Sequence, residues 1–308
     1  MASGSAAARP SLARNRRSRG DAGFDAVNLT LLSLYCLTIL YPFWSTLVLS
    51  FAPAEEAGTL GFRVWNERWT AGAYRFAFSE FGHAGIAYYN SIYRTVLGVG
   101  LTLAMTLLAA YPLAKRDLPG RKWITLYFLL MLFFSGGLIP RFLLVRGIGL
   151  LDTRWALILP LMAQAYYVII MRNFLMTIDA AYEESAFIDG ASYLQVLVRI
   201  IVPLAKPAIA TIALWAAVLH WNSWFDALIY LNSESKVVLQ TLLRRLVRAW
   251  EQETTDALDQ FLSTYATKVP SEAAKAAVIV ITIGPIIALY PFLQRYFIKG
   301  IFLGSLKG

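Results

Sequence analysis

The chain has 308 residues, of which 58% are hydrophobic and 15% charged, and its mean hydropathy is +0.55. Soluble proteins contain roughly 45–50% apolar and about 25% charged residues, so these proportions exclude an ordinary soluble protein and indicate a polytopic membrane protein. The formal charge of +9 does not indicate a nucleic-acid-binding protein, because the basic residues punctuate apolar runs instead of forming one basic face. We therefore expect membrane lipids, and no nucleic acid, around this chain.

The N-terminal region combines a basic tail with a long apolar run. The arginines of the tail over 1–26 precede an apolar run over 27–51, an order that superficially resembles a cleavable secretory signal. The apolar part of such a signal is roughly 7–15 residues long, and this run is longer. We therefore predict a first membrane helix preceded by a disordered cytoplasmic tail.

Six apolar runs are long enough to cross the ~30 Å hydrocarbon core as helices, for which about 20 residues are needed. They cover 27–51, 86–113, 121–145, 154–174, 205–231 and 273–297. Gly and Pro within them are tolerated in membrane helices as kinks. We predict an all-α membrane protein with a membrane domain over 27–298 and a C-terminal tail over 299–308.

The loop between the second and third spans is short and basic. Its basic residues are Lys115, Arg116, Arg121 and Lys122. Short loops dominate the positive-inside rule, so this loop is predicted to be cytoplasmic. Both termini are then cytoplasmic, and the long loops near 52–85 and 232–272 lie outside.

Cysteine and histidine are sparse. Cys36 is the single cysteine and lies within an apolar run, so no intrachain disulfide is expected. His83 and His220 stand apart from any cysteine or ligand-spaced acidic cluster. We therefore expect neither a metal site nor a cofactor in this chain.

The segment 179–203 between the fourth and fifth spans reads as a helix outside the bilayer. Its apolar residues recur at helical spacing on one face: Phe187, Ala191, Leu194 and Val198. Asp179 is placed to cap its start, and Gly190 would ease a break between two short helices. The residues alone leave two interpretations open, a connector packed under its own bundle and a docking surface for a partner.

The same segment resembles the EAA signature of ABC importer permeases, which reads E-A-A, three residues, Gly, nine residues and I-x-L-P. Here the sequence reads Glu184-Ser185-Ala186, then Gly190, then Ile200-Ile201-Val202-Pro203. In that family the element is a coupling helix that seats in a groove of the ATP-binding subunit. The resemblance therefore implies an ATPase-coupling role for Glu184, Ser185, Ala186, Asp189 and Gly190.

The similarity extends over roughly 25–308. Phe134–Pro140, Gly149–Thr153 and Met171–Phe174 resemble the complex-oligosaccharide branch of maltose-type carbohydrate permeases. The C-terminal tail is also similar to that branch. Because the tail of a maltose-type relative enters the ATPase dimer interface, the resemblance implies ATPase contacts for Gly304, Ser305 and Lys307.

The family implies a non-catalytic permease subunit of the bacterial inner membrane, with six spans and a coupling helix between the fourth and fifth. It would import an oligosaccharide by alternating access. The implied partners are a second related permease, a dimer of ATP-binding subunits and a substrate-binding protein. The chain contains no G-x-x-x-x-G-K-[ST] phosphate loop, so ATP and Mg²⁺ are expected on the partner ATPase subunits.

The fifth span mixes aromatic, amide and acidic residues. Charged groups within a membrane segment usually face a partner or a water-filled cavity, so Asp226 is a functional candidate. Trp221 and Trp224 could share one helix face and offer flat apolar surfaces to sugar rings, with Asn222 between them. These four residues are the predicted substrate pathway. The alternative is an interfacial aromatic belt, with Asp226 and His220 hydrogen-bonded inside the bundle.

The outer loop 232–272 predicts a helix lying in the membrane interface. Its apolar stripe consists of Leu239, Leu242, Leu243, Leu246 and Trp250. Arginines in the outer loops would favour an acidic, uronate-type sugar, or contact the binding protein, and the candidates are Arg141, Arg146, Arg154, Arg244, Arg245 and Arg248. A neutral oligosaccharide remains the alternative substrate.

Two other classes of membrane protein are considered. An ion-coupled secondary transporter should show paired repeats and midplane ionisable groups, and only Asp226 offers such a group. A membrane-embedded enzyme needs a constellation of nucleophile, base or metal ligands, which the sequence does not display.

Overall fold

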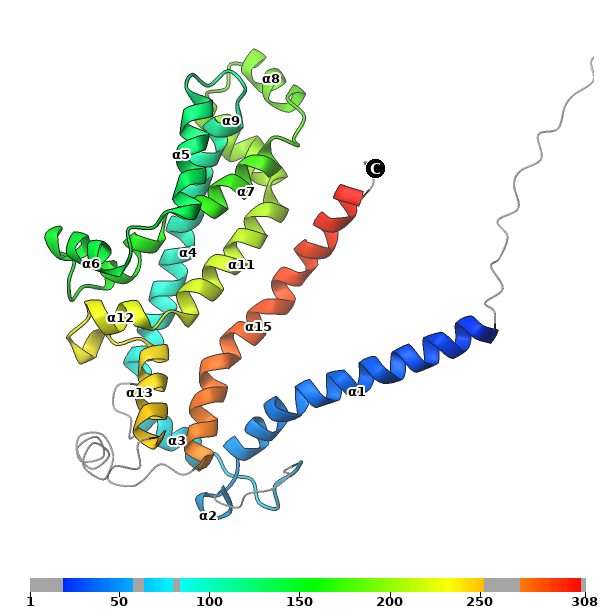
Figure 1. Ribbon diagram of the computed structural model, residues 1–308, viewed down its shortest axis with the longest axis vertical. Coiled ribbons are helices and arrows are strands. Elements are labelled where there is room, and N and C mark those ends of the chain that lie inside the picture. Colours follow the sequence, from blue (N-terminus) through cyan, green and yellow to red (C-terminus); the bar gives the residue numbers. More distant parts are fainter. Residues whose placement is uncertain (1–18, 58–63, 80–83, 252–271, 306–308) are drawn as a thin grey trace, which may run out of the picture.

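The computed structural model describes residues 19–57, 64–79, 84–251 and 272–305 (Figure 1). Within these ranges the chain is all helical, as predicted, with no strand. The longer helices are α1 (Arg19–Ser50), α3 (Gly72–Ser79), α4 (Ala84–Ala114), α5 (Arg121–Phe133), α6 (Leu138–Gly147), α7 (Ala165–Leu175), α8 (Ala181–Ile188), α11 (Lys206–Asn222), α13 (Leu239–Glu251) and α15 (Glu272–Ser305). The short ones are α2 (Ala54–Ala57), η1 (Arg154–Leu157), η2 (Leu159–Leu161), α9 (Tyr193–Val196), η3 (Leu197–Ile201), α10 (Val202–Leu204), α12 (Phe225–Tyr230) and η4 (Glu234–Lys236).

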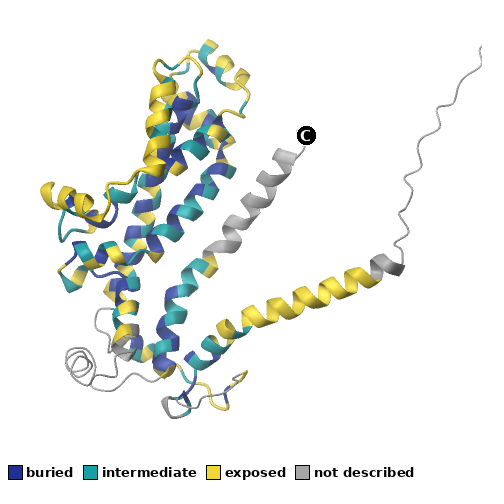
Figure 2. Cartoon of the chain, in the orientation of Figure 1, coloured by how far each residue is buried: buried dark blue, intermediate teal, exposed yellow. Residues whose placement is uncertain are grey.

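Among the residues that were searched, two helices are long and apolar enough to cross a membrane unbroken. They are the 28-residue stretch Gly23–Ser50 of α1 and the 31-residue α4, which match the first two predicted spans. α1 begins at Arg19, before the predicted start at 27, and residues 1–18 of the predicted tail lie outside the described residues. α1 diverges from the other helices and is exposed along most of its length, whereas α4 is packed within the bundle (Figures 1 and 2).

The predicted third span, 121–145, is not one straight helix. α5 and α6 meet at a bend of 113°. Gly137 precedes α6 with φ 80°, a left-handed conformation that only glycine adopts at little steric cost. The helix prediction was wrong here, because an apolar run that includes Gly136-Gly137 and Pro140 satisfies the length rule without fixing the backbone direction.

The fourth and fifth predicted spans are broken as well. Two short turns, η1 and η2, meet α7 at a bend of 47°. α11 ends at Asn222, where the Ser223 hydroxyl donates to the Leu219 carbonyl at 2.7 Å, and α12 follows after a short break. A third bent pair joins Tyr193–Leu204 to α11 at 82°. Counting each bent helix pair as one span gives at most five among the searched residues. The sixth predicted span, 273–297, lies within α15, and the count of six stays a prediction.

The main core lies where α4 crosses α7 and α11. Small residues of α4 allow a close approach, and a Cβ added to Gly98 would lie 2.5 Å from the imidazole of His220 on α11. The chain presents two ends along α4, visible in Figure 1. We call them the α8 end, which carries α8 and α9, and the α13 end, which carries α13 and α3.

Candidate functional site

At the α8 end, the predicted coupling segment folds as two short helices separated by a glycine turn. Gly190 has φ 80° between α8 and α9, which confirms the predicted break. The Asp179 carboxylate accepts a hydrogen bond from the Ala181 amide at 3.1 Å, as expected for a residue at the helix start. Ser192 and Gln195 form a capping box that begins α9.

The expected apolar stripe was wrong, because the turn at Gly190 rotates the second helix relative to the first. Phe187 and Ala191 pack against the core, whereas Leu194 and Val198 are 64% and 56% exposed. The residues that anchor the segment are instead Ala186, Val196 and Leu197, all buried.

The turn leaves an apolar surface exposed at the α8 end. We call it the α8 patch, and it consists of Tyr182, Ile188, Tyr193, Leu194 and Val198. Ile188 is 86% exposed, the highest value among the large apolar side chains described. Of the predicted coupling residues, Glu184, Ser185, Asp189 and Gly190 are exposed beside this patch, whereas Ala186 faces the core. Exposed apolar side chains gathered on one short segment, with polar residues beside them, are typical of interaction sites.

Glu183 ties α8 to α4, a role that sequence reasoning missed. Its carboxylate accepts hydrogen bonds from the Tyr111 hydroxyl at 3.0 Å and from the Lys115 ammonium. The Lys115 ammonium also lies 4.4 Å from the centre of the Tyr111 ring. The sequence did contain a signal for this contact, because the basic loop that includes Lys115 and the 179–203 segment were both predicted to be cytoplasmic. Their contact confirms that both lie at the same end of the bundle.

Two arginines secure the same end of α4. The carbonyl of Leu113 accepts hydrogen bonds from Arg121 Nε at 3.0 Å and from Arg172 Nε at 3.2 Å. Arg121 belongs to α5 and Arg172 to α7, so both helices are joined to the C-terminus of α4, where the helix dipole favours positive charge. Hydrogen bonds among α4, α5 and α7 therefore stabilise the structure beneath the α8 patch.

Beside the break between α11 and α12, a buried arginine pairs with a half-buried aspartate. Asp226, the predicted midplane acid, is bound by Arg94 of α4, which the sequence reasoning did not select. Arg94 Nη1 donates to Asp226 Oδ1 at 3.2 Å and to the Ser223 carbonyl at 3.0 Å, and Nη2 donates to Asp226 Oδ2. Arg94 is 2% exposed. The acid on which the ion-coupled alternative depended is thus neutralised by a fixed cation.

The two tryptophans of the predicted substrate pathway are separated. Trp221 is buried, and its indole donates to the Thr282 carbonyl of α15 at 2.9 Å. Because α11 ends at Asn222, Trp224 lies in the break, and the expected shared helix face was wrong. Asn222 is exposed and accepts a hydrogen bond from the Gln240 amide at 3.5 Å.

His220 departs from the alternative interpretation of this span. Asp226 is hydrogen-bonded inside the bundle as that alternative required, but neither ring nitrogen of His220 has a partner among the described residues. His220 is 1% exposed and packs against Gly98. Its role in the described structure is therefore helix packing.

The predicted outer-loop arginines lie in different surroundings. Arg244 on α13 stacks on Trp224, with its guanidinium carbon 3.7 Å from the ring centre. Arg245 Nη1 donates to both carboxylate oxygens of Glu234 at 2.9 Å, which removes Arg245 from the candidates for binding an anion. Arg154 Nε donates to Asn90 Oδ1 at 2.9 Å. The remaining three are exposed, Arg141 and Arg146 on α6 and Arg248 on α13.

α13 confirms the predicted amphipathic helix in the outer loop. Leu239 and Leu242 are buried against the chain's own helices, and Leu243 is half-buried. The side chains of Leu246 and Trp250 lie outside the described residues. The same holds for the predicted ATPase-contacting tail, Gly304, Ser305 and Lys307, although α15 continues to Ser305.

Asp152 joins two connecting segments near α12. Its carboxylate accepts hydrogen bonds from Lys236 Nζ at 2.8 Å and from the Ser233 amide at 3.0 Å. Lys236 first, and Ser233 second, hold the pKa of Asp152 well below its usual range. Asp152 has φ 54°, an unusual conformation for a non-glycine residue, and these hydrogen bonds hold it there.

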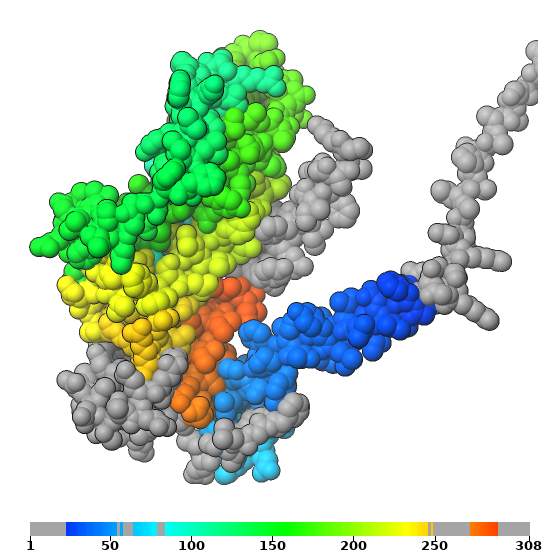
Figure 3. All heavy atoms as spheres, in the orientation of Figure 1, coloured from blue at the N-terminus to red at the C-terminus, as the bar shows by residue number. Residues whose placement is uncertain are grey.

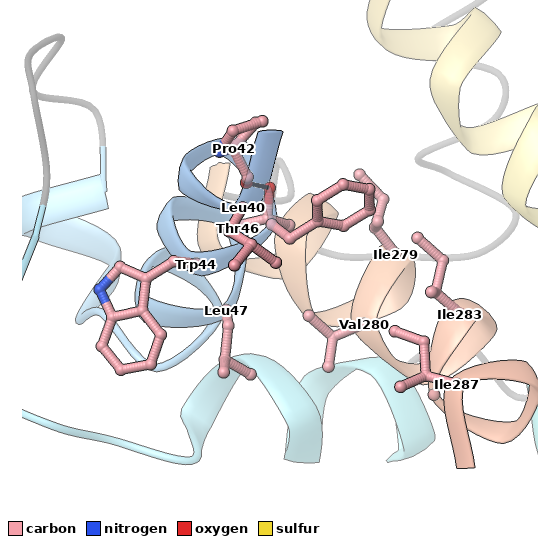
Figure 4. Close-up of a pocket in the computed structure, with 11 residues that line it drawn as sticks. Leu40, Pro42, Trp44, Thr46, Leu47, Ile279, Val280, Ile283 and Ile287 are labelled. Carbon is pink, nitrogen blue, oxygen red and sulfur yellow. Dashed lines mark hydrogen bonds between the residues drawn. The ribbon is translucent and has the colours of Figure 1, made fainter. Parts of the chain in front are cut away.

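An apolar groove of about 500 Å³ lies between α1 and α15 (Figure 4). Leu40 and Leu47 of α1 line one side of it, and Ile283 and Ile287 of α15 line the other. We call it the α1–α15 groove. Beyond it, α1 projects from the body of the molecule (Figure 3). The exposed side chains of α1 are predominantly apolar, so this helix needs lipid or another protein around it.

Known proteins are similar to this chain over nearly its whole length. The chain is 38% identical over 288 residues to the polygalacturonan/rhamnogalacturonan transport system permease protein YtcP of Bacillus subtilis (strain 168), covering 92% of this chain and 98% of that protein. It is 40% identical over 289 residues to protein LplC of the same organism, covering 92% and 95%.

A solved structure is also similar. The chain matches a chain in the crystal structure of a bacterial ABC transporter involved in the import of the acidic polysaccharide alginate, with a TM-score of 0.80 and 33% sequence identity, covering 91% of this chain and 98% of that one. The family model described as "binding-protein-dependent transport system inner membrane component" matches residues 3–303. The chain therefore belongs to the binding-protein-dependent transport system inner membrane components, the permease family of ABC importers.

Proposed function

We propose that this chain is the permease subunit of an ATP-driven importer that moves an acidic, uronate-containing oligosaccharide across the bacterial cytoplasmic membrane. The observation that carries the proposal is similarity over nearly the full length to proteins whose names concern acidic polysaccharides. These are the polygalacturonan/rhamnogalacturonan permease and the alginate importer. The paired state of Asp226 and Arg94 further disfavours an ion-coupled carrier.

The α8 patch is the proposed docking surface for the ATP-binding subunits. It is apolar and exposed, and the acidic Glu184 and Asp189 border it. Beneath it, Glu183 connects α8 to Tyr111 and Lys115 at the end of α4. Movement imposed on the patch would therefore reach α4 directly as well as the helices adjacent in sequence.

A second permease is proposed to cover α1. Its apolar surface is exposed, and the α1–α15 groove offers a place for an apolar helix. ATP and Mg²⁺ would be bound by the ATPase partners, to which the tail residues Gly304, Ser305 and Lys307 would contribute contacts. The substrate-binding protein would deliver the sugar at the α13 end, the end that the positive-inside rule predicts to lie outside.

The docking surface is tested with the reconstituted transporter. Glu184→Ala and Gly190→Val are compared with the unsubstituted chain, and ATP hydrolysis stimulated by substrate-loaded binding protein is measured. Both variants should lose stimulation, because one removes an acid beside the α8 patch and the other places a branched side chain at φ 80°. Unchanged assembly and stimulation in both variants would contradict the docking assignment.

A further inference from the structure

Arg244 and Trp224 form a preorganised cation–aromatic pair at the break between α11 and α12. The guanidinium carbon lies 3.7 Å from the indole centre. The Thr241 hydroxyl, also on α13, donates to the Trp224 carbonyl at 3.1 Å, so a hydrogen bond fixes the same two segments together. A stacked guanidinium uses its planar face and leaves the N–H donors along its edge available.

The state of those donors distinguishes Arg244 from its neighbours. Arg245 is bound by Glu234, Arg94 by Asp226, and Arg154 by Asn90. Within the described part of the chain, Arg244 makes no hydrogen bond or ion pair, and its side chain is exposed. With respect to the described residues, Arg244 is therefore a positioned cation whose hydrogen-bond donors are available to an external acceptor.

The surroundings of the pair suit a sugar. Asn222 is exposed and Gln240 half-buried, and the two amides lie 3.5 Å apart. Amides donate to and accept from hydroxyl groups. Phe225 is 44% exposed, and its ring centre lies 5.5 Å from that of Trp224, so an apolar surface adjoins the polar groups. Flat apolar surface beside amides and a cation matches the mixed chemistry of a uronate ring.

We propose that Asn222, Trp224, Phe225, Gln240 and Arg244 form a subsite that binds a uronate residue of the oligosaccharide, with its carboxylate on the guanidinium edge of Arg244. We call these five residues the Arg244–Trp224 site. The inference rests on the proposed function. Guanidinium and carboxylate form paired, charge-assisted hydrogen bonds, which are about twice as strong as neutral ones.

The local charge favours an anion. The nearby negative charge of Asp226 is compensated by Arg94, so it does not oppose an approaching carboxylate. Arg248 on the same helix is exposed and adds positive charge. The site is at the opposite end of α4 from the α8 patch, so binding of sugar and docking of ATPase would not compete.

The test measures uptake into vesicles by the complete transporter with two probes of equal length and linkage. One is trigalacturonate and the other is its fully methyl-esterified form, which lacks the charges. Arg244→Gln is compared with Arg245→Gln, the matched control whose guanidinium already has a partner, and with Arg244→Lys, which keeps the charge but loses the planar donor edge. Stimulation of ATP hydrolysis by the binding protein reports assembly.

Arg244→Gln should raise the KM for trigalacturonate about tenfold, the effect of losing one exposed charge-assisted contact, and leave kcat and stimulated hydrolysis unchanged. Arg244→Lys should give a KM for trigalacturonate between those of the unsubstituted chain and Arg244→Gln. Any uptake of the methyl ester should be the same in all of these variants. An unchanged KM in Arg244→Gln, or an equal rise in Arg245→Gln, overturns the subsite. If the unsubstituted complex assembles but takes up no trigalacturonate, the proposed function itself fails and the subsite with it.

Discussion

The α8 patch and the Arg244–Trp224 site lie at opposite ends of α4 and are built differently. The patch comes from one continuous stretch, 182–198, whose residues lie near one another because two short helices and a glycine turn hold them there. The outer site joins α13 to the end of α11, and the ion pair beside it connects residues 132 positions apart. A local motif can predict the first kind of site, whereas the second depends on helix packing.

Among the variants considered, removal of Arg94 is expected to destabilise the region around the Arg244–Trp224 site the most. Arg94→Met would leave the half-buried carboxylate of Asp226, which is 19% exposed, without its cation. Breaking a fully buried pair typically costs about 3–5 kcal/mol, so the free energy of unfolding of the purified chain in detergent should fall by up to that amount. The double variant Arg94→Met/Asp226→Leu should recover most of the loss. Equal stability of Arg94→Met and the unsubstituted chain would show that the pair does not support the helix break.

The close packing of α4 against α11 is tested by substituting a glycine of α4. Gly98→Ala places a Cβ 2.5 Å from the His220 ring, and such overpacking typically costs about 1–3 kcal/mol. Gly100→Ala is the matched control, because nothing lies within 4 Å of the added Cβ. Thermal unfolding should separate the two variants clearly. Identical midpoints would mean that His220 does not pack where the structure places it.

The connection beneath the α8 patch should give a smaller effect on stability. Glu183→Gln weakens the hydrogen bonds from Tyr111 and Lys115, an expected loss of about 1–2 kcal/mol for a charged partner. The ATP hydrolysed per sugar imported should rise, because docking would persist while transmission to α4 weakens.

The charge-swapped pair Glu183→Lys/Lys115→Glu provides the control for that prediction. It restores an ion pair between α8 and α4 and should partly recover the ATP-to-sugar ratio. A ratio that is normal in Glu183→Gln would show that movement reaches the bundle only through the helices adjacent in sequence.

The sequence predicted the helical class, the long helices α1 and α4, and the break at Gly190, because each depends on local length, composition or glycine conformation. It did not predict the 113° bend between α5 and α6, since membrane helices tolerate Gly and Pro and the apolar run continues through the bend. Periodicity also misplaced Leu194 and Val198, because it assumed one continuous helix across Gly190.

Among candidate site residues, sequence reasoning selected Asp226, Trp224 and Arg244 separately but could not pair them. Arg94 was missed because a lone arginine in an apolar run has no local pattern that reveals its partner. Arg244 and Arg245 are adjacent and chemically identical in sequence, and only their neighbours in space, Trp224 and Glu234, distinguish an available cation from an occupied one.

The most direct test of the proposed function is ATP-dependent accumulation of trigalacturonate in vesicles that contain this chain with its ATPase, second permease and binding protein. We predict accumulation against a gradient when ATP is supplied on the side of the α8 end, and none when ATP is omitted. ATP-independent equilibration, or accumulation driven by a proton or sodium gradient alone, would contradict the account.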